Sequence, residues 1–366
     1  MSEKKTSVHY INYLELDKIL NAQNPISGHG KEAAHDEMFF IIIHQTYELW
    51  FKQIIHEVDS IMDLFKQEKI NEENIGIIVS RIERVNKILH VLVQQIDVLE
   101  TMTSADFLDF RHHLSPASGF QSHQFRKLEL MLGLKIKDRH QFGGCPYHNE
   151  FEGAKKKEIL HLEDSESLFK LVEKWLERIP FLNMEGFNFI EKYETVVNEM
   201  MNNQVSDLKK SPLLSDQDKE LRIRMIEENR KYFERVFDEE VHQKAVLNGE
   251  TSLSYKATMS ALLINLYREQ PILHLPSKFL KHLVELDHQI ASWRFRHVQM
   301  VEKTLGQKIG TGGSSGQGYL KKTVEQHKLF TDIANISTLM ISRSYAPELP
   351  ENVKEQLGFN FTDKWK

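Results

Sequence analysis

The 366-residue sequence has almost no cysteine, since Cys145 is the only one. No disulfide can form within the chain, and this usage is typical of a reducing compartment. The sequence also lacks an excess of basic residues: 47 Lys and Arg stand against 53 Asp and Glu, for a formal net charge of -6. Nucleic-acid-binding proteins carry a basic face, so this balance argues against a nucleic-acid partner.

Long apolar runs are missing as well. The most apolar stretch, MFFIIIHQTYELWF (38–51), is too short and too polar to cross a bilayer, so we expect no membrane association. The charged N-terminus, MSEKKTSVHY, lacks the apolar core of a secretory signal. Together with the cysteine usage, these features predict a cytoplasmic protein.

Helical periodicity runs through almost the whole chain. Apolar side chains recur every three or four residues from Phe40 to Phe65 and again over 72–103. Further helical patterns cover 163–178, 184–203, 215–246 (with Ser215 as N-cap), 252–268, 276–305 and 319–341, and only 138–151 is a candidate for a small irregular element. We predict an all-α fold: a single large helical-bundle domain with long helices over 34–366, preceded by an N-terminal arm of residues 1–33.

Two of the 18 histidines lie on otherwise apolar helix faces. His44 follows Phe40 by four residues and precedes Phe51 by seven. The other is the only polar member of a longer stripe, formed by Leu283, Leu286, Ile290, Trp293, His297 and Val301. A histidine on such a face is often a hydrogen-bonded core residue, but it also has the setting of an axial metal ligand, and the pattern leaves both interpretations open.

The segment FLDFRHHLSPASGFQSHQF (107–125) presents Arg111 one helical turn after Phe107 and just before a turn rich in serine. A fixed guanidinium near small hydroxyl side chains suits bidentate capture of a carboxylate. For the arginine alone, an ordinary surface ion pair with Asp106 or Asp109 is the simpler explanation.

The glycine-rich segment GQKIGTGGSSGQGYLKK (306–322) does not fit a nucleotide-binding loop. A phosphate-binding loop of the Walker type needs a lysine after its last glycine, where this chain has Tyr319. A dinucleotide-binding turn needs three glycines in a fixed pattern after a strand, but position 315 is serine and the preceding pattern is helical.

Other metal sites have partial support. Glu158–His161 and Glu239–His242 match the Glu-x-x-His unit of di-iron bundles, although both follow strongly charged stretches that are typical of solvated faces. Cys145 and His148 supply only half of a zinc site. We therefore place di-iron and zinc chemistry well behind the two histidines on apolar faces.

Four blocks, in this order and spacing, resemble the tryptophan 2,3-dioxygenase family: NYLELDKIL (12–20), HDEMFFIIIHQTYELWFKQIIHEVDS (35–60), LETMTSADFLDFRHHLSPASGFQSHQFRKLE (99–129) and WRFRHVQMVEKTLGQKIGTGGSSGQGYL (293–320). The resemblance implies an all-α homotetramer with one haem b per subunit, its iron cycling through Fe(II). It also implies the reaction, which cleaves the indole C2–C3 bond of L-tryptophan with O2 to give N-formyl-L-kynurenine.

The resemblance carries roles to individual positions. His297 matches the histidine that binds the haem iron, and His44 matches the distal, catalytic histidine beside the indole. Trp293 and Ser118 match positions around the haem. The matching substrate-binding positions are Phe40, Phe107, Arg111 for the carboxylate, Thr311 for the amino-acid end, and Tyr13, which the arm lends to a neighbouring subunit. The glycine-rich segment is then expected to close over the substrate.

The chain departs from the family pattern at two places. Ile43 stands where many members have threonine, and His112-His113 replaces an acidic-aromatic pair. Retention of both amino-acid anchors, Arg111 and Thr311, favours tryptophan as the substrate. The alternatives are a haem monooxygenase of the same fold that acts on another indole or aromatic amino acid, and a sensor that binds haem or tryptophan without turnover.

Overall fold

The computed structural model describes residues 8–28, 33–134, 147–184, 186–306, 308 and 328–359. These residues are mostly helical, and the strands among them form one two-stranded antiparallel sheet. The predicted all-α fold is therefore confirmed. Among the described residues, no helix combines the length and the apolar character needed to cross a membrane.

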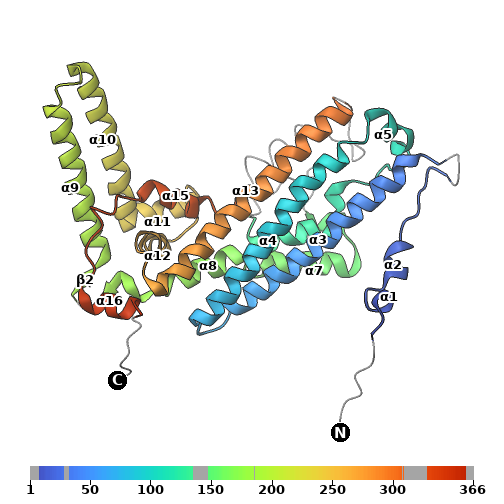
Figure 1. Ribbon diagram of the computed structural model, residues 1–366, viewed down its shortest axis with the longest axis horizontal. Coiled ribbons are helices and arrows are strands. Elements are labelled where there is room, and N and C mark those ends of the chain that lie inside the picture. Colours follow the sequence, from blue (N-terminus) through green and yellow to red (C-terminus); the bar gives the residue numbers. More distant parts are fainter. Residues whose placement is uncertain are drawn as a thin grey trace, which may run out of the picture.

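Three long helices form the frame of the molecule: α3 (His35–Phe65), α4 (Glu72–Leu99) and α13 (Pro271–Leu305). They run side by side, with α4 packed against both of the others (Figure 1). Each presents an apolar stripe because its apolar residues recur with the helical period. The stripes meet in a buried core that includes Val58 and Ile61 of α3, Ile78 and Ile82 of α4, and Leu283 of α13.

Shorter helices cover this frame at both ends. On the α3 side lie α5 (Ser104–Arg111), η2 (Gly119–Gln121), α6 (His123–Leu132), η4 (Tyr147–Glu150), α7 (Gly153–Asp164) and α8 (Leu168–Glu177). The chain continues through η5 (Pro180–Leu182), β1 (Asn183–Met184), β2 (Phe187–Asn188), α9 (Phe189–Lys210), α10 (Asp216–Phe237), α11 (Glu239–Asn248), α12 (Tyr255–Leu266), α15 (Thr331–Leu339) and α16 (Glu351–Leu357). Figure 1 shows α9 and α10 as a hairpin at the end of the molecule opposite α5.

The two short helices of the N-terminal arm lie apart from this helical body (Figure 1), whereas residues 22–27 are hydrogen-bonded to α3. These helices, α1 (Tyr10–Tyr13) and α2 (Leu16–Leu20), contain no buried residue. Large apolar side chains of the arm are instead exposed, namely Val8, Tyr10, Ile11, Tyr13, Leu14, Ile19, Leu20 and Ile26. The division into an arm of residues 1–33 and a domain of residues 34–366 stays a prediction.

Several predicted helices are wrong at their ends because local caps interrupt the periodic pattern. The helix predicted over 215–246 is two helices, since the Asp238 side chain accepts a hydrogen bond from Val241 N and starts α11. Likewise α4 ends at Leu99 rather than 103, because Thr103 forms a capping box with Asp106 at the start of α5. The predicted N-cap Ser215 is confirmed, with Asp218 N donating to its Oγ at 3.1 Å.

Asp287 connects α13 to the segment that precedes α15. Its buried carboxylate accepts hydrogen bonds from Leu329 N at 3.0 Å and from Phe330 N at 2.5 Å. Burial raises the pKa of Asp287 to about 6, although the two backbone N–H groups favour the charged form.

Replacing Asp287 by Asn should change how stability depends on pH. The unfolded chain releases this proton near pH 4, whereas the folded chain keeps it to about pH 6. As the pH rises from about 4 to about 6, the folded wild type therefore becomes less stable, and above pH 6 the contribution of this group no longer changes. The amide of Asp287→Asn does not titrate, and its single oxygen accepts from only one of the two N–H groups, a cost that does not change with pH. The melting temperature of the variant, relative to that of the wild type, should therefore rise with pH up to about pH 6. A difference in melting temperature that stays constant with pH would contradict this expectation.

Candidate active site

Helices α3 and α13 bring together the two histidines that lie on apolar faces. Trp293, which stacks on the His297 ring, also contacts Tyr47 of α3, three residues after His44, so the packing of α13 on α3 brings the two histidines to one region. Burial, and to a smaller extent repulsion from the nearby His44, lower the pKa of His297 to about 4. At neutral pH His297 is therefore uncharged, which leaves a ring nitrogen with the lone pair that binds a metal.

The His297 ring stacks on Trp293, one helical turn earlier. Their ring centroids are 5.7 Å apart and the rings are within 9° of parallel. Trp293 in turn contacts Tyr47 and Phe51 of α3 and Phe125 of α6, at centroid distances of 6.1, 6.2 and 5.1 Å. This aromatic cluster fixes the turn of α13 that carries His297 against two other helices.

The tautomer of His44 follows from its hydrogen bond. Its Nδ1 lies 2.7 Å from the backbone oxygen of Phe40, and a carbonyl oxygen can only accept, so Nδ1 carries the proton. In the neutral ring Nε2 is then an acceptor. Burial lowers the pKa of His44, against opposing effects of the Phe40 carbonyl and Glu48, so the ring is neutral at pH 7. The side chain of His44 is nevertheless exposed to solvent.

Three phenylalanines form an aromatic wall beside His44. Phe40 lies 4.1 Å from the His44 ring, 5.7 Å from Phe107 and 5.5 Å from Phe110, measured between centroids. The wall ends at Arg111, the half-buried last residue of α5. Because α5 packs on both α3 and α13, it carries Arg111 on an element that contacts the helices of His44 and His297.

Ser118 lies in the turn that follows α5. Its half-buried side chain accepts a hydrogen bond from Phe120 N at 3.3 Å, and its own N–H donates to Gln121 Oε1 at 3.3 Å. Both bonds belong to the cap of η2. Within the described segments no acceptor takes the hydroxyl proton of Ser118, so it can donate to a ligand.

Glu48 is a residue of this region that the sequence analysis missed. It lies one helical turn after His44, and its carboxylate accepts from Ser122 Oγ at 2.6 Å and from Gln124 Nε2 at 2.9 Å. The Gln124 amide also donates to the Glu48 backbone oxygen at 2.8 Å. Glu48 thus ties the serine-rich turn to the helix of His44. A carboxylate one turn after a histidine on an apolar face was the signal available in the sequence.

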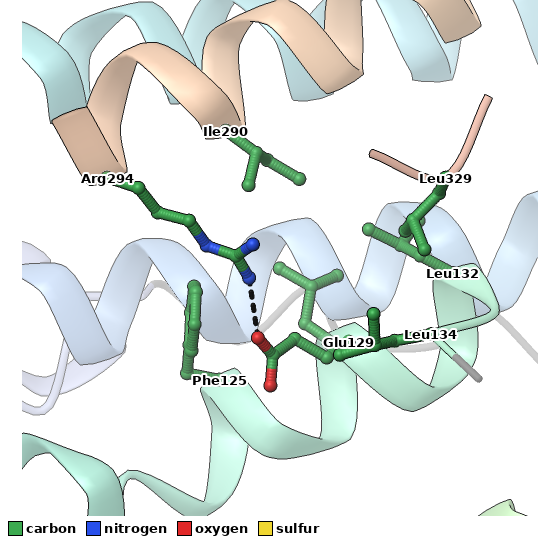
Figure 2. A pocket seen from close by; sticks show the side chains of 8 residues that line it. Phe125, Glu129, Leu132, Leu134, Ile290, Arg294 and Leu329 are labelled. Atoms are coloured by element: carbon green, nitrogen blue, oxygen red, sulfur yellow. Dashed lines mark hydrogen bonds and ion pairs between the residues drawn. The ribbon is translucent and has the colours of Figure 1, made fainter. Parts of the chain in front are cut away.

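A buried network of ion pairs lies one turn from His297 (Figure 2). Arg294 of α13 pairs with Glu129 of α6 at 2.5 Å, and Glu129 pairs with Arg126 at 2.7 Å. Figure 2 shows Arg294 and Glu129 meeting beside Phe125, around a very small cavity. Removing one partner of a buried ion pair typically costs about 3–5 kcal/mol. The network therefore fixes α13 to α6 close to His297.

Other predicted site residues are not brought to this region. The Tyr13 side chain on α1 is 73% exposed. Thr311, most of the glycine-rich segment and Cys145 lie outside the described residues.

The two Glu-x-x-His units have other partners. Glu158 of α7 pairs with Lys127 at 2.8 Å, and His242 of α11 donates from Nε2 to Leu253 O at 2.9 Å. In the described part of the chain, no three His, Cys, Asp or Glu side chains are grouped so that they could hold a metal ion. The two units therefore serve packing and surface pairing in separate helices.

Comparison with known proteins gives one consistent match. Residues 1–340 match the family model described as tryptophan 2,3-dioxygenase. A tryptophan 2,3-dioxygenase of Bdellovibrio bacteriovorus is 45% identical over 358 residues, which cover 98% of this chain and 100% of the relative. The Dictyostelium discoideum enzyme of the same name is 45% identical over 353 residues, covering 96% and 88%. Tryptophan 2,3-dioxygenase B of Danio rerio is 42% identical over 354 residues, covering 95% and 86%.

Proposed function

The chain belongs to the tryptophan 2,3-dioxygenase family and is a tryptophan dioxygenase, and we propose that His297, His44 and Arg111 hold the haem and the substrate for this reaction. The reaction cleaves the C2–C3 bond of the L-tryptophan indole with O2 and gives N-formyl-L-kynurenine. The observation that carries the assignment of roles is the meeting of two neutral histidines beside an aromatic wall that ends in an arginine.

The residues around His297 fit a haem. A neutral imidazole in an apolar stripe would hold the haem iron, and Trp293, stacked on it, offers a flat surface beside that ligand. We assign one haem b per subunit, with His297 as ligand to an iron that cycles through Fe(II), and with Trp293 and Ser118 at its periphery. When bound, the haem supplies the activation of O2.

The same geometry supports a binding mode for L-tryptophan. His44 Nε2 accepts a hydrogen bond from the indole N–H, since its Nδ1 is already the donor to Phe40 O. Phe40 and Phe107 pack against the ring, and Arg111 pairs with the carboxylate. Thr311 holds the amino-acid end in this proposal, although it lies outside the described residues. Fixing both ends of the substrate raises its effective concentration at the reacting bond and selects one enantiomer.

We also propose a cytoplasmic homotetramer in which each arm packs on a neighbouring subunit and Tyr13 completes that subunit's site. The exposed apolar side chains of α1 and α2 support this arrangement, because burying them between subunits stabilises the assembly. The single cysteine supports the cytoplasmic location.

Replacing His44 by Ala should slow tryptophan turnover only moderately. One neutral hydrogen bond contributes about 0.5–1.5 kcal/mol, which corresponds to a loss of about two- to tenfold. An obligatory general base would cost about 100- to 10,000-fold. The variant should also improve the turnover of 1-methyltryptophan relative to tryptophan, because this substrate has no N–H to donate. Steady-state rates for both substrates test the assignment, which fails if wild type and variant discriminate equally.

Turnover by the haem-loaded protein tests the proposed function as a whole. After anaerobic reduction and addition of L-tryptophan, admitting air should produce N-formyl-L-kynurenine. Full haem occupancy without product would instead favour the sensor alternative.

A further inference from the structure

A cavity of about 260 Å³ lies among α10, α11, α12 and α15. These helices are at the end of the molecule opposite α5, and none of the residues around His44 and His297 lines the cavity (Figure 1). Much of its wall is apolar, formed by Val236, Val241, Ala245, Ile336 and Leu339. A dry cavity of about 150 Å³ binds benzene, so this one has room for about ten non-hydrogen atoms.

A buried histidine gives the cavity an acceptor. His242 lines the wall and is only 7% exposed. Its Nε2 lies 2.9 Å from Leu253 O, which can only accept, so Nε2 carries the proton and Nδ1 of the neutral ring is an acceptor. Within the described parts of the chain, Nδ1 has no hydrogen-bond donor of its own. As an acceptor in the wall of the cavity, Nδ1 favours a ligand that donates a hydrogen bond.

Asp332 gives the cavity a negative charge. Ser252 N and Leu253 N both donate to its Oδ2, at 2.5 and 3.0 Å, which fixes the carboxylate; among the described residues no donor is bonded to Oδ1, which can accept from a ligand. Arg235 and Glu250 also line the cavity, 3.9 Å apart, and both side chains are more than half exposed. Their charges offset each other, so the negative charge of Asp332 dominates.

We propose that this cavity binds a small organic ammonium ion with an apolar body, its N–H groups donating to Asp332 Oδ1 and His242 Nδ1. An ammonium group has three donors and no acceptor, so it matches a carboxylate beside an imidazole acceptor. The apolar wall receives the rest of the molecule. An anion of the same size would be repelled by the negative charge of Asp332, because the charge of Arg235 is already offset by Glu250.

The proposal is tested by calorimetric titration of the full-length protein with 2-phenylethylamine, which fills about ten atom positions. The matched anion, phenylacetate, should bind at least about tenfold more weakly. Asp332→Asn keeps the acceptor for Ser252 N and Leu253 N but removes the charge, and it should weaken amine binding by about tenfold or more.

Ala245→Leu should abolish amine binding because the added atoms occupy the cavity. The control is Leu247→Ala, which alters an 86% exposed side chain of the same helix and should bind the amine as the wild type does. Thermal unfolding establishes that each variant is folded, and the comparison of amine with acid needs no variant. Equal binding of amine and acid would overturn the proposal, as would undiminished amine binding by both Asp332→Asn and Ala245→Leu.

Discussion

Replacing His297 by Ala should abolish stable haem binding and, with it, tryptophan turnover. His297 is the only polar member of its stripe on α13, and its burial keeps the ring neutral and able to bind iron. The nearby His44 is not a substitute, because its Nδ1–H is committed to Phe40 O and its Nε2 faces the substrate in the proposed binding mode. Haem content per subunit after reconstitution, read from absorbance, measures the effect.

Two companion variants separate ligation from folding. His288→Ala alters an exposed histidine of the same helix and should leave haem content unchanged. His297→Gly should regain haem when imidazole is added, because the free ring can occupy the space of the lost side chain. Full haem occupancy and an unchanged axial-ligand spectrum in His297→Ala would show that another residue binds the iron.

Replacing Arg111 by Ala should weaken L-tryptophan binding by about 2–5 kcal/mol, the range for removing one partner of a desolvated charge pair. This corresponds to about 30- to several thousand-fold in affinity. Tryptamine lacks the carboxylate, so its binding should change much less. Both affinities can be measured by titration of the haem-loaded protein without oxygen, which prevents turnover.

Arg111→Lys is the matched control for the carboxylate contact. It keeps the positive charge but loses the planar fork that binds both carboxylate oxygens, so an intermediate loss is expected for L-tryptophan. Equal losses for L-tryptophan and tryptamine in Arg111→Ala would show that Arg111 only supports the structure around α5.

The sequence was most informative where a prediction depends only on which face of a single helix a residue occupies. The stripe on α13 places His297 on the face of Trp293, and the stripe on α3 places His44 on the face of Phe40; in the structure the rings of each pair are in contact. These predictions depend only on the helical period within one element. The meeting of the two histidines came from the family resemblance, since periodicity says nothing about which helices pack together.

Contacts between distant segments could not be predicted in this way. The bonds of Glu48 to Ser122 and Gln124, and the pairing of Glu129 with Arg294, depend on how α3, α6 and α13 pack. The break at Asp238 was missed for a different reason: its capping signal is local, but a continuous apolar period runs across it. Asp287 is similar to Glu48, because its partners lie more than 40 residues later in the chain.

The fate of both oxygen atoms tests the central claim most directly. The haem-loaded, reduced protein is given L-tryptophan under isotopically labelled O2, and the product is analysed at once by mass spectrometry. A dioxygenase that cleaves the C2–C3 bond places one labelled atom in the formyl group and the other in the ketone of N-formyl-L-kynurenine. Product with both labels is the predicted result. A product that carries a single labelled oxygen, with the indole ring intact, would contradict the account and favour the monooxygenase alternative.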